Sequence, residues 1–150
     1  MKRSVMTKYG MVVLEAGPKG IVSLELSRGR AKKYNDRSVY LDKLERYLKE
    51  YFKGRKTAVA FPLDLKGTEF RKKVWRALLK IPYGETRSYA WVAKQAGNLK
   101  ACRAAGNAVG KNPVAIVIPC HRVIRSDGSL GGFSSGLKWK RILHKVEKIV

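Results

Sequence analysis

Three short helical segments follow one another between residues 68 and 110, and each begins at a capping residue and stops at glycine or proline. The expected helices cover residues 69–80, 89–96 and 99–109, with Thr68, Ser88 and Asn98 as their N-caps. Gly97 leaves only a tight turn between the second and third helices. Two helices joined in this way are typical of a helix-turn-helix, which we place at about 88–110, but ordinary helical cores contain the same hairpin.

The first sixty residues predict a different kind of unit. Residues 11–16 and 21–26 are short β-like runs, and the Pro and Gly residues between them suit a tight turn. Apolar residues then recur at helical spacing over residues 38–52, and residues 59–61 are expected to form a further strand. The predicted fold class is α/β (α+β), with a small N-terminal α/β domain at 1–62 and a mostly helical C-terminal domain at 63–150 that contains the helix-turn-helix.

The chain is strongly basic. It has 33 Lys and Arg against 11 Asp and Glu, a formal net charge of +22 in 150 residues. A field of this sign attracts polyanions and speeds their encounter with the protein, so nucleic acid is the favoured partner. The solvated surface of a protein from a thermophile would show the same excess, and charge alone does not say which nucleic acid is bound.

Composition also bears on location and on metal binding. No stretch approaches the roughly 20 continuous apolar residues of a membrane-spanning helix, and the start of the chain lacks the pattern of a signal peptide. We therefore expect a soluble, cytoplasmic protein. Two cysteines, Cys102 and Cys120, and two histidines, His121 and His144, are too few and too poorly spaced for a structural zinc site. The expected compartment favours free thiols over a disulfide.

The third expected helix is rich in small residues. Ala and Gly fill most of residues 100–108, where the only cations are Lys100 and Arg103. Small side chains let a helix backbone lie close to another surface, which could be a partner helix or a groove lined by phosphates. The surrounding positive charge favours the phosphates.

Cys120 stands between a proline and a histidine at the end of an apolar run, residues 113–119. This β-branched run predicts a buried strand or extended segment that delivers the thiol to a fixed place. A buried cysteine is often only a small hydrophobic residue, but the adjacent His121 and the nearby cations favour a reactive thiol. Neighbouring residues of a strand point to opposite faces, so contact with His121 would need a bend or a bridging water. A cysteine hydrolase is therefore an alternative on chemistry alone.

The residues around Cys120 resemble those of a known family. The run Pro119-Cys-His-Arg-Val123, preceded by Gly110-Lys-Asn-Pro113 and further upstream by Tyr89 and Arg103, is similar to the active-site region of the O6-alkylguanine-DNA alkyltransferases, or methylated-DNA–protein-cysteine methyltransferases. The similarity covers about residues 70–147. It implies a monomeric DNA repair protein that binds O6-alkylguanine-containing duplex DNA in the minor groove and flips the nucleotide. It also implies irreversible, single-turnover transfer of the alkyl group to the protein's own cysteine, without a cofactor.

The resemblance implies roles for single residues as well. Cys120 would be the alkyl acceptor, His121 would act through a water as the base that generates the thiolate, and Glu147 would polarise that histidine. Asn112 would fix the turn beside the active-site segment. Tyr89 would help to rotate the phosphate and would donate a proton or hydrogen bond to the departing guanine.

Other residues would contact DNA or line the pocket by the same resemblance. Arg103 would fill the gap left in the base stack, Gly106 would allow close approach of the recognition helix, and Lys100 would be a further DNA contact. The expected lining of the substrate pocket is Val123, Phe133, Ser134 and Ser135.

Three hypotheses remain open from the sequence. They are an alkyl transfer protein, a lesion-binding relative that transfers nothing, and an unrelated basic nucleic-acid-binding domain with an inert cysteine. Cys120 favours the first over the second, because the binding-only relatives typically have another residue there. Cys102 could be a second reactive thiol, although a packing role is the simpler interpretation.

Overall fold

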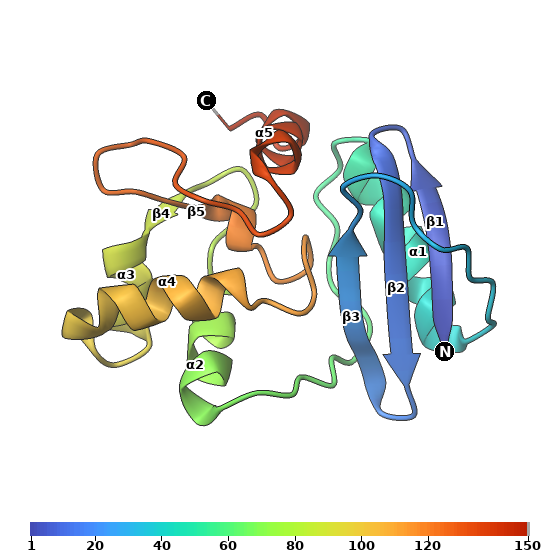
Figure 1. The fold of residues 1–150 in the computed structure, drawn as a ribbon, viewed down its shortest axis with the longest axis horizontal. Coiled ribbons are helices and arrows are strands. Elements are labelled where there is room, and N and C mark those ends of the chain that lie inside the picture. Colours follow the sequence, from blue (N-terminus) through green and yellow to red (C-terminus); the bar gives the residue numbers. More distant parts are fainter. Residues whose placement is uncertain (150) are drawn as a thin grey trace. The chain divides into compact units, whose positions relative to one another are not determined.

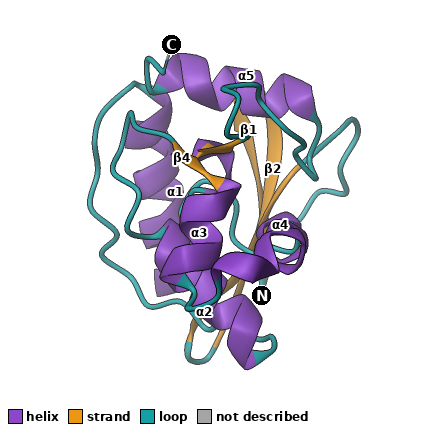
Figure 2. Ribbon diagram, turned by 90° about the vertical axis from the view of Figure 1, so that its left-hand side faces the viewer, coloured by secondary structure: helices purple, strands orange, loops and turns teal. Residues whose placement is uncertain are grey.

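The computed structural model describes residues 1–149 and divides the chain into two compact units, Met1–Leu65 and Lys66–Val150 (Figure 1). The sequence placed the boundary slightly earlier, after residue 62. Strands and helices occur in both units, so the predicted α+β class is confirmed (Figure 2). Within residues 1–149, none of the helices is long and apolar enough to cross a membrane.

The first unit is built on a three-stranded antiparallel sheet. Its strands are β1 (Lys2–Thr7), β2 (Gly10–Gly17) and β3 (Gly20–Leu26), in the order β1-β2-β3. Val12, Leu14 and Ala16 on β2 are buried in alternation, as expected for a sheet with one covered face. The predicted hairpin of β2 and β3 is confirmed. Strand β1 was not predicted because Val5 and Met6 are its only apolar residues.

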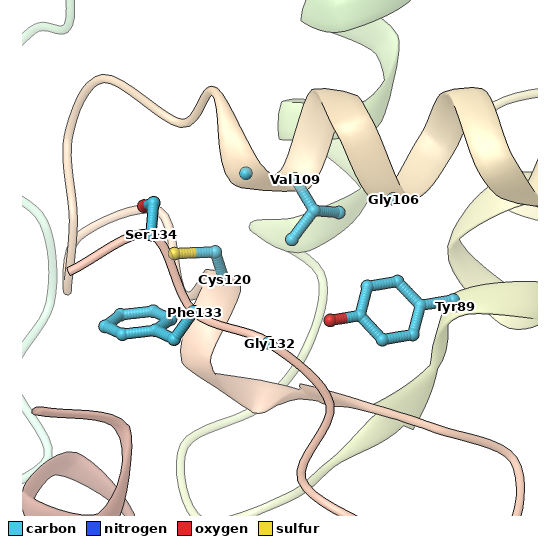
Figure 3. Close-up of a pocket in the computed structure, with 8 residues that line it drawn as sticks. Tyr89, Gly106, Val109, Cys120, Gly132, Phe133 and Ser134 are labelled. Carbon is cyan, nitrogen blue, oxygen red and sulfur yellow. The ribbon is translucent and has the colours of Figure 1, made fainter. Parts of the chain in front are cut away.

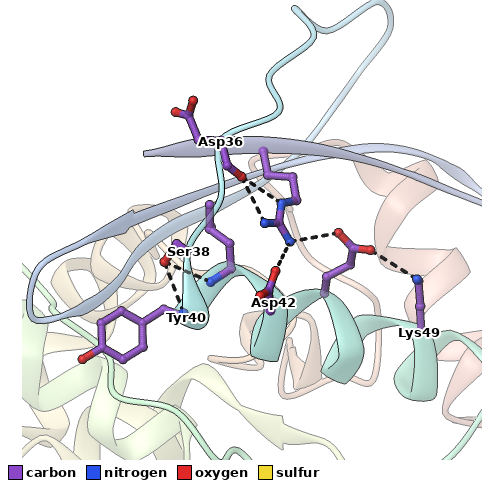
Figure 4. Close-up of polar contacts among 8 residues, drawn as sticks. Asp36, Ser38, Tyr40, Asp42 and Lys49 are labelled. Carbon is purple, nitrogen blue, oxygen red and sulfur yellow. Dashed lines mark hydrogen bonds and ion pairs between the residues drawn. The ribbon is translucent and has the colours of Figure 1, made fainter.

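Helix α1 (Val39–Phe52) packs against this sheet. The Ser38 hydroxyl accepts the N–H of Tyr40 at 3.2 Å and caps the helix, as Figure 4 shows. The buried face of the helix consists of Leu41, Leu44, Tyr47, Leu48 and Tyr51. Arg3 on β1 donates to the Asp42 carboxylate at 2.8 Å, which ties the first strand to the first turn of the helix.

The strand expected at residues 59–61 does not form, so that prediction was wrong. Leu63 instead makes one isolated parallel bridge with Ile21 on β3. The Ile21 N–H donates to the Pro62 carbonyl at 2.9 Å, and the Asp64 N–H donates to the Ile21 carbonyl at 2.8 Å. Pro62 has no N–H with which to continue a ladder, so the pairing stops after a single bridge.

Gly20 lies at the closest approach of this contact. Its φ is +146°, and a Cβ on it would lie 2.5 Å from the Pro62 carbonyl oxygen. We therefore expect Gly20→Ala to lower the free energy of unfolding in urea by about 1–3 kcal/mol. Gly29→Ala is the matched control, because nothing lies within 4 Å of a Cβ there, and should change it by no more than about 0.5 kcal/mol. Equal losses in the two variants would contradict the steric argument.

The second unit contains the three predicted helices. They are α2 (Glu69–Leu78), α3 (Tyr89–Gln95) and α4 (Cys102–Gly110), and a 3-10 turn (Leu99–Ala101) leads into the last. The side chains of Thr68, Ser88 and Asn98 accept the N–H groups of Arg71, Trp91 and Lys100, respectively. Thr68 and Ser88 therefore cap α2 and α3 as predicted, whereas Asn98 caps the 3-10 turn, and α4 itself begins three residues later without a side-chain cap. Gly97, with φ +94°, reverses the chain between α3 and the 3-10 turn.

Helices α2, α3 and α4 pack on one another around a common core. The Trp75 indole N–H on α2 donates to the Ala108 carbonyl on α4 at 2.9 Å. Ala105 and Ala108 are buried in this core, so part of the small-residue face of α4 packs inside the unit. Arg103 and Ala104 on the same helix remain exposed and available to another surface.

Apart from the half-buried Pro113, the segment 113–119 is buried, as predicted, but it is not a strand. The N–H groups of Val117 and Ile118 donate back to the carbonyls of Ala115 and Val114, at 2.8 and 3.0 Å. Ile116 adopts φ +70°, an unusual conformation for a β-branched residue. Turns within the segment satisfy these backbone groups, and for this reason the prediction of an extended strand was wrong.

The remaining elements of the second unit follow these turns in the chain. A 3-10 turn (Cys120–Arg122) runs into β5 (Val123–Ile124), which pairs in parallel with β4 (Arg87–Ser88). Helix α5 (Leu137–Val146) follows, with Trp139 and Leu143 buried. Cys120 is therefore positioned by a short buried turn between α4 and a small sheet.

Candidate active site

Cys120 lies at the wall of a cavity of about 230 Å³ in the second unit. The cavity is lined by Tyr89, Gly106, Val109, Gly110, Cys120, Gly132, Phe133 and Ser134. These residues come from α3, α4, the turn at Cys120 and the loop before α5. Figure 3 shows the Tyr89 ring reaching from α3 towards Cys120 and Gly132, with Ser134 beside the sulfur. The pocket thus combines one thiol, one phenol and a hydroxyl on largely apolar walls.

The thiol is held in its protonated form. Burial raises the pKa of the Cys120 thiol to about 11, although a side-chain hydrogen bond from Asn112 and the charge of Lys140 both oppose the rise. The backbone N–H groups of Cys120 and His121 oppose it too. At neutral pH the resting cysteine is therefore a thiol, and a base must take its proton before it can act as a nucleophile.

His121, which follows Cys120 in the sequence, forms a fully buried pair with Glu147. The His121 Nε2 contacts one carboxylate oxygen of Glu147. The other oxygen accepts from Arg122 Nε at 2.8 Å and from the Gly84 N–H at 3.0 Å. Burial lowers the pKa of His121 even though Glu147 acts in the opposite direction, so the imidazole is neutral at pH 7. A neutral imidazole beside a fixed carboxylate is suited to accept a proton.

Asn112 connects the end of α4 to the segment that delivers the cysteine. Its side-chain NH₂ donates to the Ile118 carbonyl at 2.7 Å, and its carbonyl oxygen accepts the Val114 N–H at 3.0 Å. The amide therefore holds both ends of the buried turns before Cys120. A hydrogen bond from its side chain also opposes the rise in the pKa of the Cys120 thiol.

Tyr89 is half-buried at the other side of the pocket. Burial raises the pKa of its phenol, so the hydroxyl keeps its proton at neutral pH. Gly131 lies against it: a Cβ on Gly131 would be 3.1 Å from the Tyr89 hydroxyl oxygen, and Gly131 has φ +71°. The loop can pass this close to the phenol because position 131 carries no side chain.

Not every expected site residue meets this pocket. Gly106, Phe133 and Ser134 line it, whereas Val123 is fully buried in β5 and Ser135 is not among its lining residues. Lys100 and Arg103 belong to a different, more open cavity of about 660 Å³ between α2 and α4. That cavity is also lined by Thr68, Phe70, Arg71, Ala101, Ala104, Asn107 and Ala108. Two of the expected DNA contacts, Lys100 and Arg103, thus lie at this basic surface, whereas Tyr89 and Gly106 line the thiol pocket itself.

Three buried residues around the site were not found from the sequence. Arg122 donates to Glu147 and, at 2.7 Å, to the Ile81 carbonyl. His144 Nε2 contacts the His121 carbonyl oxygen at 2.6 Å. Lys140 is completely buried on α5. Its position gives a usable signal, because a lysine three residues before Leu143 and next to Trp139 falls on the apolar stripe of its helix.

Comparison with known proteins identifies the family. A family model described as the DNA binding domain of 6-O-methylguanine DNA methyltransferase matches residues 69–149, which is more than half of the chain. The chain belongs to this methyltransferase family. A methylated-DNA–protein-cysteine methyltransferase of Methanosarcina barkeri is 40% identical over 149 residues, covering 96% of this chain and 94% of the relative. The resemblance drawn from the residues around Cys120 is confirmed.

Solved structures of the methyltransferase family share this fold. The Mycobacterium tuberculosis OGT in complex with DNA matches 98% of this chain and 92% of its own with a TM-score of 0.88 and 38% identity. Schizosaccharomyces pombe Atl1, in complex with damaged DNA containing O6-carboxymethylguanine, matches 57% of this chain and 81% of its own at 29% identity, with a TM-score of 0.51. The methyltransferase likeness therefore covers both units, whereas the Atl1 likeness covers little more than half of the chain.

Proposed function

We propose that this protein repairs DNA by transferring the alkyl group of O6-alkylguanine, mainly O6-methylguanine, to the sulfur of Cys120. The observation that carries the proposal is a buried, free cysteine in the wall of a pocket within the family's DNA binding domain. The products of the transfer are an S-alkylcysteine and unmodified guanine. A thioether is stable, so each protein molecule reacts once.

The transfer is a direct displacement at carbon. The S–C bond forms while the bond between the alkyl carbon and O6 breaks, and the electron pair of that bond stays on the guanine. His121 takes the thiol proton through a water. Glu147 holds the His121 imidazole in place, and Arg122 in turn holds the Glu147 carboxylate. The Tyr89 phenol, protonated at neutral pH, donates a proton or hydrogen bond to the guanine as it departs. The proton taken from the thiol finally replaces the lost alkyl group, so the guanine leaves in its neutral form.

The base must leave the duplex to reach the pocket. Flipping a nucleotide costs a few kcal/mol in lost stacking and pairing. Arg103, exposed on α4, fills the gap in the stack, while Lys100 contacts the DNA beside it and Gly106 lets the helix approach the minor groove. Readout in that groove is degenerate, which suits repair of a lesion in any sequence context.

Arg103 therefore provides a test of flipping. In Arg103→Ala we expect transfer from duplex DNA to slow about ten- to hundred-fold, which is about 1.4–2.8 kcal/mol of the unstacking cost. Transfer from the free base O6-methylguanine, which needs no flipping, should keep its rate. Arg46→Ala removes the same charge from the exposed surface of α1 and is the control. Equal slowing with both substrates would argue against the role in flipping.

The proposed function is tested by intact-protein mass after incubation with a duplex that contains one O6-methylguanine. A gain of one methylene, located on the peptide that contains Cys120, is expected; an undamaged duplex should give none. Tight binding of the lesion without any gain in mass would instead assign the protein to the lesion-binding relatives that transfer nothing.

Three more general features belong to the same proposal. We infer that the protein acts as a monomer in the cytoplasm, where its DNA substrate and the reducing conditions that suit its free thiols are found. The excess of Lys and Arg supports an origin in a thermophile. A thermal unfolding midpoint in the range of mesophile domains, about 45–65 °C, would contradict that origin.

A further inference from the structure

His144 is a second buried histidine beside the proposed base. It lies in the last turn of α5, and its Nε2 contacts the His121 carbonyl oxygen at 2.6 Å. A carbonyl oxygen only accepts hydrogen bonds, so the Nε2 of His144 carries a proton and donates the bond. Helix α5 therefore anchors the backbone of His121, in the same short turn that carries Cys120.

This contact also brings the two imidazole rings close to each other. Their centroids lie 6.4 Å apart, and a protonated His144 lowers the pKa of His121. His144 is 8% exposed, whereas His121 is completely buried, so a charge costs less on His144. The C-terminal end of α5 favours a cation there as well, because the last turn of a helix carries a partial negative charge.

Other titratable and charged groups face this pair of rings from the elements around it. They are Arg122 in the turn, Glu147 and Lys140 at either side of His144 along α5, and Tyr83, whose ring lies 5.7 Å from the Arg122 guanidinium. Glu147 raises the pKa of His121 and Arg122 lowers it, but these two charges are joined in one ion pair. Lys140 keeps its charge in mild acid, since burial lowers its pKa only to about 8. Histidine is the residue type that ordinarily gains charge in mild acid, so among these neighbours His144 is the one whose effect on His121 follows pH.

The proposed reaction needs a neutral His121. Its Nε2 faces the Glu147 carboxylate, which accepts a hydrogen bond, so Nδ1 is the nitrogen that takes the thiol proton. Once acid protonates Nδ1, His121 can no longer act as the base. A positive His144 opposes this loss by keeping a larger share of His121 neutral, although each neutral imidazole is then a somewhat weaker base.

We propose that His144 is a positioning residue for His121: its N–H fixes the backbone of the base, and its positive charge in mild acid keeps the His121 imidazole neutral. The inference rests on the proposed function, because a neutral His121 matters only if it takes the proton of Cys120. The thiol proton still goes to His121, and His144 takes no part in its transfer. Alkyl transfer thereby extends to lower pH than His121 alone would allow.

Histidine NMR tests the charge directly, because His121 and His144 are the two histidines of the chain. The imidazole signals are followed between pH 4.5 and 8 in the wild type and in His144→Gln, in which His121 is the one remaining histidine. Glutamine can still donate to the His121 carbonyl but carries no charge, so the titration midpoint of His121 should move to higher pH. Single-turnover methyl transfer from an O6-methylguanine duplex should slow about three-fold on its acid limb and less than two-fold at pH 8.

Two further variants test the anchor and provide the control. His144→Leu removes the N–H as well as the charge, and its transfer rate at pH 8 should fall about ten-fold, because the base is no longer held in place. Lys145→Gln removes a positive charge from the exposed neighbour of His144 and should leave the His121 midpoint and the rate unchanged. If His144→Leu does not fold, the NMR midpoint of His144→Gln still decides the inference.

The outcomes separate the two roles from each other and from the proposed function. An unmoved His121 midpoint in His144→Gln would overturn the role of the charge, and equal rates of His144→Leu and His144→Gln at pH 8 would overturn the anchor. Failure of the wild type to transfer methyl would overturn the proposed function. Transfer by the wild type together with an unmoved midpoint in His144→Gln would overturn only the inference about His144.

Discussion

Cys120→Ser is expected to abolish alkyl transfer completely while the protein still folds and binds DNA. Serine has nearly the shape of cysteine, so the substitution should leave the buried turn and the pocket wall intact. A hydroxyl is a far weaker nucleophile than a thiolate, and His121 cannot generate an alkoxide at neutral pH. The intact mass should therefore stay constant however long the variant is incubated with O6-methylguanine DNA.

Two measurements make this result specific to the nucleophile. Binding of the methylated duplex, followed by fluorescence anisotropy, should keep its affinity within about three-fold, which is less than 1 kcal/mol. Cys102→Ser removes the other thiol, which is exposed on α4, and should retain full transfer. A gain in mass in Cys120→Ser, or its loss in Cys102→Ser, would mean that the acceptor had been assigned to the wrong cysteine.

Local signals in the sequence were sufficient for most helices of the fold. Ser38, Thr68, Ser88 and Asn98 each satisfy N–H groups at the start of a segment, and such caps depend only on neighbours in the chain. The alternation on β2 was equally local. These features could be predicted because the residues that cause them lie within one turn or one strand.

The two wrong strand predictions concern segments whose backbone hydrogen bonds depend on residues outside the segment. Residues 113–119 have the composition of a strand, but they fold into turns that Asn112 stabilises from outside the run. Residues 59–61 were expected to pair, but Pro62 limits the contact to one bridge with Ile21. Periodicity does not reveal whether a sheet edge is available, so both strand predictions were wrong.

The predictions of site residues succeeded and failed for similar reasons. The resemblance pointed to His121 and Glu147, and the structure brings them into contact although 26 residues separate them. Lys140 and Arg122 were not predicted as site residues, because one basic residue cannot be distinguished from the others in a chain with 33 Lys and Arg. Burial distinguishes them from the rest. For Lys140 the apolar stripe of α5 gives a local signal of burial, whereas the burial of Arg122 is a property of the folded unit rather than of the local sequence.

Glu147→Gln is expected to cost about 3–5 kcal/mol of folding free energy, because it leaves the buried Arg122 guanidinium without its counter-charge. Glutamine has the same shape, but its NH₂ must face either the two N–H donors at one oxygen position or His121 at the other. The Arg122 and Gly84 N–H groups point to one carboxylate oxygen and His121 lies at the other. Urea unfolding measures the loss, and Glu85→Gln, which breaks an exposed pair with Arg87, is the control and should change stability by less than about 1 kcal/mol.

The same variant should lose transfer and become more sensitive to acid. Without the carboxylate, His121 is a weaker base, and we expect the single-turnover rate to fall about a hundred-fold. Burial already holds the pKa of folded His121 below its usual 6.5, so the unfolded chain takes up a proton first as pH falls. His121 therefore destabilises the fold progressively below about pH 6.5, through its lower folded pKa. Glu147 opposes that shift, so its removal lowers the folded pKa further and widens the window. Urea midpoints at pH 7.5 and 5.5 should diverge more in Glu147→Gln than in the wild type; a smaller divergence would mean that Glu147 does not support the imidazole.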